Sequence, residues 1–254
     1  MISAQRVVPT TVIRANDSFK RFKPEPSYEV RKPDVTGTEI DQLRARREML
    51  RGMTPEKALE VIEFHRDLNF FQALALAKQG GKLIVPNDVH DRILMETADQ
   101  EYPKQNYPIR TGTLVIYEKP DKPFGEEIFF QGITFNIPQQ FRGKTNCALV
   151  IQHPDFELVN LGNNKYEIRV PDEANIRLIE DFPKKNEWYM PDAETSIPHG
   201  KAVKESSDSR CLWRSTTGSY LGPLGRGGRS NIDYRGRDVG AYDYWFVGLG
   251  VALL

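Results

Sequence analysis

The chain has 254 residues, a length that fits one large domain or two small ones. Its 35 basic and 35 acidic residues cancel, which argues against a generally basic nucleic-acid-binding protein. No apolar run approaches the roughly 20 residues of a membrane-spanning helix. The start of the chain lacks the basic and apolar regions of a conventional signal peptide. We therefore expect a cytoplasmic or virion-associated protein without a membrane span.

The first 52 residues are expected to form an N-terminal arm and a charged helix. Residues 1–38 are polar with scattered prolines, which is typical of an arm or linker. Residues 39–52 have a helical, heavily charged pattern that predicts a solvated helix, and Gly52 is a suitable stop. We place the main domain at residues 53–254.

Three further helices are predicted in the first part of this domain. Thr54, followed by a proline, is a good N-cap, and an apolar stripe extends that helix to about Arg66. Asn69 is suited to cap a second helix that ends at Gly80–Gly81. A short strand over 83–86 then stops at a proline, and Asp88 is expected to cap a third helix.

The hydrophobic period changes to two from Gly112, which predicts strands. Gly162-Asn163-Asn164 marks a hairpin between two of them. Residues 112–170 therefore form a strand-rich insertion or subdomain, and 183–210 form a long connection. Helices that precede strands indicate the α+β class. The expected strands are Thr113–Glu118, Glu127–Ile137, Ala148–Gln152, Phe156–Leu161 and Lys165–Val170.

The C-terminal segment, residues 205–254, has the composition of a binding surface. It holds almost half of the 19 glycines and four of the ten tyrosines. Rigid aromatic groups and short polar groups are the usual materials of recognition surfaces. An aromatic core in a small sheet is the alternative. The predicted ligand-binding residues are Trp213, Ser215, Tyr220, Asn231, Asp233, Tyr234, Arg235, Asp238, Tyr242, Asp243, Tyr244 and Phe246.

The last eight residues, 247–254, are apolar. An apolar strand here suggests that this end is tied into a sheet.

No motif indicates a catalytic centre, a metal or a cofactor. The histidines lack metal-ligand spacing, and His90 beside Asp91 is better explained as a surface or capping residue than as a general base. The glycines and arginines of 225–229 lack the context of a nucleotide-binding loop. Cys147 and Cys211 are expected to be two separate buried thiols.

The arginines of the C-terminal segment have two alternative interpretations. They would form a local anion-binding patch, or they would pair with Asp233, Asp238 and Asp243 and stack on the tyrosines. The arginines concerned stand at positions 214, 226, 229, 235 and 237.

Two parts of the chain together resemble one family. The segment FFQALALAKQGGKLIVPNDVHDRIL, residues 70–94, is similar to a helix, apolar pair, proline and helix unit of formylglycine-generating-enzyme-like and related C-type-lectin-fold domains. LWRSTTGS (212–219), RGGRS (226–230) and WFVGLGVAL (245–253) resemble that family's later motifs and its closing strand. The last motif departs from the family pattern, because Gly250-Val251-Ala252 lacks the usual arginine.

Within that fold, the terminal segment resembles the variable region of target proteins of diversity-generating retroelements. The resemblance implies a non-enzymatic, receptor-binding protein that displays a diversified surface to a protein or cell-surface ligand. Formylglycine-generating enzymes use a pair of C-terminal cysteines, whereas only Cys211 lies in that region. The calcium-binding strings of sugar-binding lectins are absent.

Two alternatives stay open at the level of sequence. The first is a formylglycine-generating-enzyme-like oxidoreductase that uses His90 and Cys211. The second is a structural virion component whose residues 1–50 dock onto an assembly.

Overall fold

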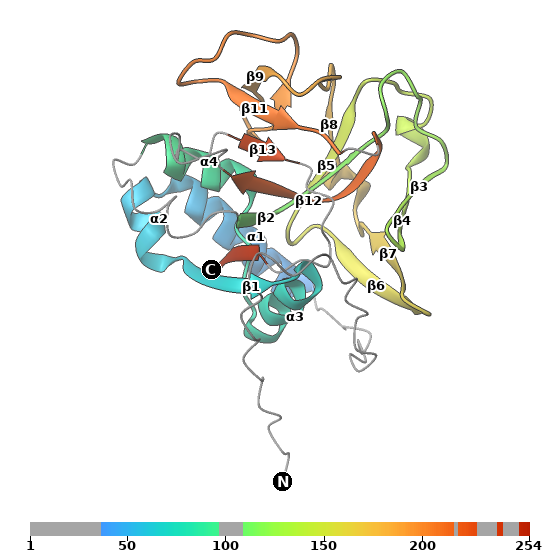
Figure 1. Ribbon diagram of the computed structural model, residues 1–254. Helices are drawn as coiled ribbons and strands as arrows, with labels where there is room; N and C mark the ends of the chain where they lie inside the picture. The colour runs from blue at the N-terminus through green and yellow to red at the C-terminus, as the bar shows by residue number, and fades with distance from the viewer. Residues whose placement is uncertain (1–36, 97–108, 216–217, 228–237, 241–248) are drawn as a thin grey trace, which may run out of the picture.

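The structure is a computed structural model, and it describes residues 37–96, 109–215, 218–227, 238–240 and 249–254 (Figure 1). These residues form an α+β protein with four α-helices and two β-sheets, as the order of the predicted elements indicates. No helix in the described ranges has both the length and the apolarity that a bilayer crossing requires.

The helices come first in the chain, and they pack against the large sheet in two separate groups (Figure 1). The Asn69 side chain accepts a hydrogen bond from the Gln72 backbone N–H, and the Gln72 side chain accepts one from the Asn69 backbone N–H. The two bonds form a capping box. Gly81 follows with a left-handed φ of 57°, the conformation that ends a helix at glycine. The four helices are α1 (Gly37–Gly52), α2 (Pro55–Val61), α3 (Phe70–Gly80) and α4 (Asn87–Glu96).

Two details of the predicted helices are wrong. The helix that begins after Thr54 ends at Val61, and the chain continues as strand β1 (Glu63–Leu68). Pairing with the end of the chain overrides the local helical pattern here, because Phe64 lies opposite Ala252 in an antiparallel ladder. Asp88 lies inside the first turn of α4 rather than before it.

The large sheet has ten strands in the path β1-β14-β2-β12-β13-β11-β9-β10, with β5 paired to β2 and β8 paired to β5. Four of its described strands, β11, β12, β13 and β14, come from the C-terminal segment. The strands after β1 are β2 (Ile109–Tyr117), β5 (Ala148–Gln152), β8 (Arg177–Ile179), β9 (Trp188–Pro191), β10 (Pro198–His199), β11 (Arg210–Trp213), β12 (Tyr220–Gly227), β13 (Asp238–Gly240) and β14 (Leu249–Leu253).

Strand β14 ties the end of the chain into this sheet, as its apolar sequence predicts. It lies between β1, to which it is antiparallel, and β2, to which it is parallel. Leu83 and Leu254 exchange backbone hydrogen bonds of 2.8 and 2.9 Å. The strand expected over 83–86 is reduced to a single bridge between Ile84 and Leu253.

The second sheet has the order β3-β4-β7-β6 and contains three of the five strands predicted in the strand-rich region, whereas the other two are β2 and β5 of the large sheet. The single strand expected over 127–137 is two strands, because Gln131 and Gly132 turn with positive φ values of 51° and 86°. The hairpin at Asn163 and Asn164 is confirmed, and both residues have positive φ. The strands are β3 (Glu127–Phe130), β4 (Ile133–Asn136), β6 (Glu157–Gly162) and β7 (Lys165–Arg169). Short 3-10 helices occur at Gln139–Phe141 and Glu173–Asn175.

Two clusters of buried side chains form the core. The larger joins α3 to both sheets and includes Phe70, Leu114 and Ile133. The smaller joins α1, α2 and α4 to one end of the large sheet and includes Leu50 and Ile93. Burial of these apolar groups fixes the helices against the sheet.

The sequence predicts a solvated charged face for helix α1; Asp41 and Glu48 are exposed as expected, but the arginines of the helix contact other parts of the protein. Arg44 and Arg47 both donate to the carboxylate of Asp155, at 2.7 and 2.6 Å. Asp155 is only 3% exposed, so this contact holds α1 on the body of the protein. The prediction failed because the partner lies more than 100 residues away in sequence.

Candidate functional site

Three of the twelve predicted ligand-binding residues have described side chains. Trp213 ends β11 and is half-buried. Tyr220 is fully buried, its hydroxyl donates to the Pro223 carbonyl at 2.8 Å, and its ring stacks near Tyr117. Ser215 is also buried, and its backbone N–H donates to the Tyr117 hydroxyl. Packing in the core therefore removes Tyr220 and Ser215 from an exposed binding surface.

The backbone of Asp238 is described in β13, where it pairs with Gly227 of β12 and Cys211 of β11. The remaining predicted residues lie outside the described residues. They are Asn231, Asp233, Tyr234, Arg235, Tyr242, Asp243, Tyr244 and Phe246.

A buried ion-pair cluster joins strands β11 and β12 of the C-terminal segment to helix α4. Arg210 donates from Nε and Nη2 to the two carboxylate oxygens of Asp91, at 2.6 and 2.8 Å. The Nη2 of Arg226 donates to the same Asp91 Oδ1. All three side chains are less than a tenth exposed. This cluster, Asp91 with Arg210 and Arg226, is called the Asp91 clamp below.

The Asp91 clamp joins the two strands that flank β13. Arg210 begins β11, Arg226 lies near the end of β12, and β13 lies between those strands. Burial by itself would raise the pKa of Asp91, but the charges and hydrogen bonds of Arg226 and Arg210 outweigh it and lower that pKa. The carboxylate therefore stays ionised, and it fixes the spacing of β11 and β12.

His90 is fully buried, which corrects its prediction as a surface or capping residue. Burial and then the charge of Arg226 lower its pKa to about 3, so the imidazole is neutral near pH 7. It lies on the face of α4 that packs against the large sheet rather than in water. A long-range contact again decided the environment, since no neighbour in sequence indicates this burial.

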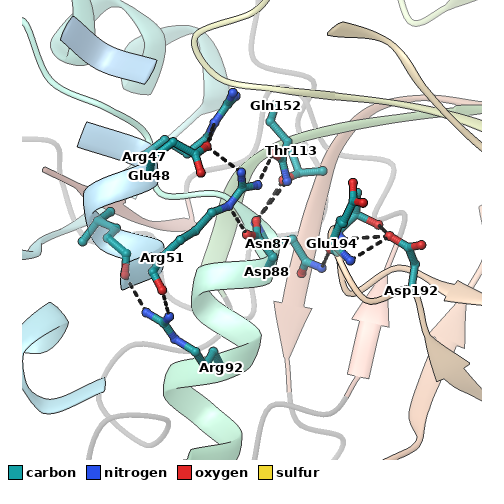
Figure 2. A network of polar contacts seen from close by, with 12 residues as sticks. Arg47, Glu48, Arg51, Asn87, Asp88, Arg92, Thr113, Gln152, Asp192 and Glu194 are labelled. Carbon is teal, nitrogen blue, oxygen red and sulfur yellow. Dashed lines mark hydrogen bonds and ion pairs between the residues drawn. The ribbon is translucent and has the colours of Figure 1, made fainter. Parts of the chain in front are cut away.

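A cleft of about 550 Å³ lies beside the Asp91 clamp, along α4. Arg51 of α1 donates to Asp88 at 2.7 Å and to the Gln152 side chain at 2.7 Å, and Gln152 donates to the other oxygen of Asp88 (Figure 2). Arg92 points to the end of α1 and donates to the Leu50 and Arg51 carbonyls (Figure 2). The lining residues are Arg51, Asp88, Val89, Asp91, Arg92, Met95, Glu96, Ala193, Glu194, Ser196 and Arg210.

Two of the five arginines singled out in the sequence are described, whereas the side chains of the aspartates expected as their partners lie outside the described residues. Arg226 belongs to the Asp91 clamp. Arg214 lies 4.3 Å from the ring centroid of Tyr117 and 5.3 Å from that of Phe182. It also donates to the carbonyls of Glu118 and Gly218. Both arginines therefore make contacts inside the protein that connect different segments of the chain.

Cys147 and Cys211 are two separate buried thiols that form no disulfide, as predicted. Within the described ranges, no group of three or more His, Cys, Asp or Glu side chains is arranged to hold a metal ion.

Sequence reasoning missed the Asp91 clamp and the arginine contacts of α1. Asp91 was considered only with its neighbour His90, although its partners lie 119 and 135 residues away. Arg226 was expected either in an anion-binding patch or in a pair with Asp233, Asp238 or Asp243, and not with Asp91. No spacing rule links these positions, so the sequence alone carries no signal for the clamp.

The comparisons with known proteins assign no family. No protein-family model, curated protein or solved structure matches this chain.

Proposed function

We propose that this protein is a non-enzymatic ligand-binding protein with a C-type-lectin-like scaffold, and that it is the variable target protein of a diversity-generating retroelement. Its ligand is a protein or a cell-surface molecule. We assign the binding face to the predicted residues other than Tyr220 and Ser215, which are buried. They are Trp213, Asn231, Asp233, Tyr234, Arg235, Asp238, Tyr242, Asp243, Tyr244 and Phe246.

The observation that carries this proposal is the Asp91 clamp. Gly227 of β12 pairs with Asp238 of β13, so residues 228–237 connect two neighbouring antiparallel strands. Arg210 of β11 and Arg226 of β12 both donate to Asp91 and so fix these two strands to helix α4. A rigid base lowers the entropic cost of binding, because the displaying strands are already ordered. In such a protein the residues that stabilise the fold are different from the residues that vary on the binding face.

The lectin-like scaffold is supported by two features that the resemblance implies. Helix α3, its glycine stop, the apolar stretch at 83–85 with Pro86, and helix α4 follow in the expected order. Strand β14 closes the domain by pairing with β1.

The enzymatic alternative gains no comparable support. Both residues that it requires, His90 and Cys211, are buried. Attack on an external substrate needs an accessible nucleophile or base within hydrogen-bond reach of the substrate.

The proposal is tested by the tolerance of the fold to substitution. A library randomised at the ten proposed positions is displayed on yeast and treated with protease, beside a matched library randomised at the buried Leu212, Leu221, Leu224 and Val251. We expect most members of the first library, and few of the second, to resist proteolysis. Equal loss of resistance in both libraries would show that the aromatic segment is core and would contradict the proposal.

A further inference from the structure

Strands β9 and β11 place several apolar side chains on one face of the large sheet. Residues that stand opposite each other in neighbouring strands point to the same face, and so do residues two apart along a strand. Trp188 of β9 stands opposite Cys211 of β11. Met190 lies two residues after Trp188, and Trp213 lies two residues after Cys211. These four residues therefore share one face, which is called the outer face below.

The alternate residues of the same two strands lie on the inner face. Arg210 donates to Asp91 of α4, so this face is the one against which α4 packs. Tyr189 and Leu212 are buried in the larger core cluster. The outer face is therefore directed away from α4 and from this part of the core.

Apolar side chains of the outer face reach the surface of the protein. Met190 is 44% exposed, and Trp188 and Trp213 are half-buried. Val203, which is 37% exposed, lies beside Trp188, because its backbone N–H donates to the Trp188 carbonyl at 2.8 Å. Single exposed apolar side chains are common on proteins, whereas neighbouring ones mark interaction sites. Tryptophan and methionine are among the residues enriched in protein–protein interfaces.

This apolar surface adjoins the strands that carry the proposed binding face. Strand β13 pairs with β11 on the side away from β9, and Asp238 stands opposite Cys211 there (Figure 1). Trp213 itself belongs both to the outer face and to the proposed binding residues. Trp188, Met190 and Val203 precede the C-terminal segment, so they lie outside the part of the chain that is proposed to vary.

We propose that Trp188, Met190 and Val203 form a constant apolar anchor of the binding face, and that the ligand is a protein with a complementary apolar patch. This inference rests on the proposed function, because the anchor acts together with the variable residues. The anchor supplies affinity that all variants share, and the C-terminal residues decide which protein is bound. The flexible thioether of methionine suits such a surface, because it adapts to different partners.

The chemistry of the anchor favours a protein over a glycan. A sugar presents hydroxyl groups, which need hydrogen-bonding partners when they are buried. Val203 offers no such group in its side chain, and the Met190 thioether is only a weak acceptor.

The test uses the yeast-displayed library that is randomised at the ten proposed positions. It is selected in parallel against purified streptavidin, ubiquitin and maltose-binding protein, and against dextran-coated beads. Met190→Ser with Val203→Ser is then introduced into each protein binder. This double variant should weaken binding about tenfold, because the ligand buries less apolar area.

The chain offers a matched control for this double variant. Met49 in α1 and Val61 in α2 are the same two residue types at similar exposures, 46% and 41%. Met49→Ser with Val61→Ser should leave the affinity unchanged. Protease resistance of both double variants shows that each is folded. Should the first double variant lose this resistance, Met190→Ser alone decides, with Met49→Ser as its control.

The remaining outcomes separate this inference from the proposed function. Binders that keep their affinity without the anchor side chains overturn the anchor and leave the proposed function intact. Equal losses in the anchor and control variants overturn the anchor as well. A library that yields binders to dextran and to none of the proteins shows that the ligand is a glycan, which overturns the inference. A protease-resistant library that yields no binder at all contradicts the proposed function itself, and the anchor with it.

Discussion

Arg210 and Arg226 bind the same oxygen of Asp91, although they lie on different strands and Asp91 lies on helix α4. The strand between them, β13, is only three residues long and has no long ladder of its own. One buried carboxylate thus fixes the strands that hold β13 on both sides. The account of function depends on this rigidity.

Removal of the clamp carboxylate should destabilise the fold strongly. Asp91→Ala leaves two buried guanidinium groups without their counter-charge, so we expect the free energy of unfolding to fall by about 3–5 kcal/mol. Urea denaturation followed by circular dichroism measures this change. As a control, Asp121→Asn alters an exposed carboxylate that pairs with Lys184, and its unfolding curve should stay close to that of the wild type. Similar midpoints for the two variants would contradict the structural role of Asp91.

Stability should fall in mild acid because two buried histidines resist protonation. Burial, with the nearby charge of Arg226, lowers the pKa of His90 to about 3; burial is also the main cause that lowers the pKa of His153 to about 4. The unfolded chain takes up these protons near pH 6.5. Proton uptake therefore stabilises the unfolded state relative to the native state, and this effect grows as the pH falls from about 6.5 to about 3. The contribution of the two neutral histidines to the free energy of unfolding is therefore fully present above pH 6.5 and is lost as the pH falls towards 3.

Urea denaturation across this pH range checks the sign and the window. His153→Asn removes one titrating group and retains an acceptor for the Ile84 backbone N–H, which His153 Nδ1 accepts at 3.2 Å. This variant should show a shallower fall of stability between pH 6.5 and 4. An unchanged slope would mean that His153 does not govern the acid response.

Gly112 should tolerate no side chain. A Cβ atom there would lie 2.2 Å from the backbone oxygen of Ile84, inside any allowed contact distance. We expect Gly112→Ala to cost about 3 kcal/mol, because the backbone must shift. Gly125→Ala is the matched control, since nothing lies within 4 Å of its Cβ position. Equal thermal midpoints for the two variants would show that the strand and the 83–85 stretch are not in this close contact.

Leu253→Asp should unfold the domain. Leu253 is 0% exposed in β14 and lies opposite Glu63 of β1, so the substitution buries a charge without a partner. Limited proteolysis should show rapid digestion of this variant. Leu161→Asp, at a position 53% exposed on β6, should be digested like the wild type. A wild-type digestion pattern for Leu253→Asp would mean that β14 is dispensable.

Local signals in the sequence predicted the elements that depend on near neighbours. The Asn69 cap, the Gly81 stop and the Asn163-Asn164 hairpin all act within a few residues, and all three are confirmed. The apolar closing strand was also predictable, because its composition is decisive without a known partner.

The predictions that were wrong concern residues whose environment depends on partners far away in the sequence. Residues 63–66 follow a helical pattern but form β1 because β14 is available to pair with them. His90 and the arginines of α1 were expected in solvent, yet each is taken up by groups far away in the chain. Tyr220 shares its composition signal with the proposed binding residues, and only packing against Tyr117 shows that it is core. The composition of the C-terminal segment therefore did not distinguish core residues from candidate binding residues.

The central claim is that the C-terminal segment is a diversified binding face, and sequencing of the encoding locus tests it most directly. The account predicts a reverse transcriptase gene and a near-copy of the 3′ coding end beside this gene. Differences from the near-copy should fall mainly at adenines, in the codons of Trp213 to Phe246, and should spare those of Arg226 and the closing strand. Absence of a copy, with an invariant 3′ end among close relatives, would contradict the account and leave the aromatic segment as core or as a fixed site.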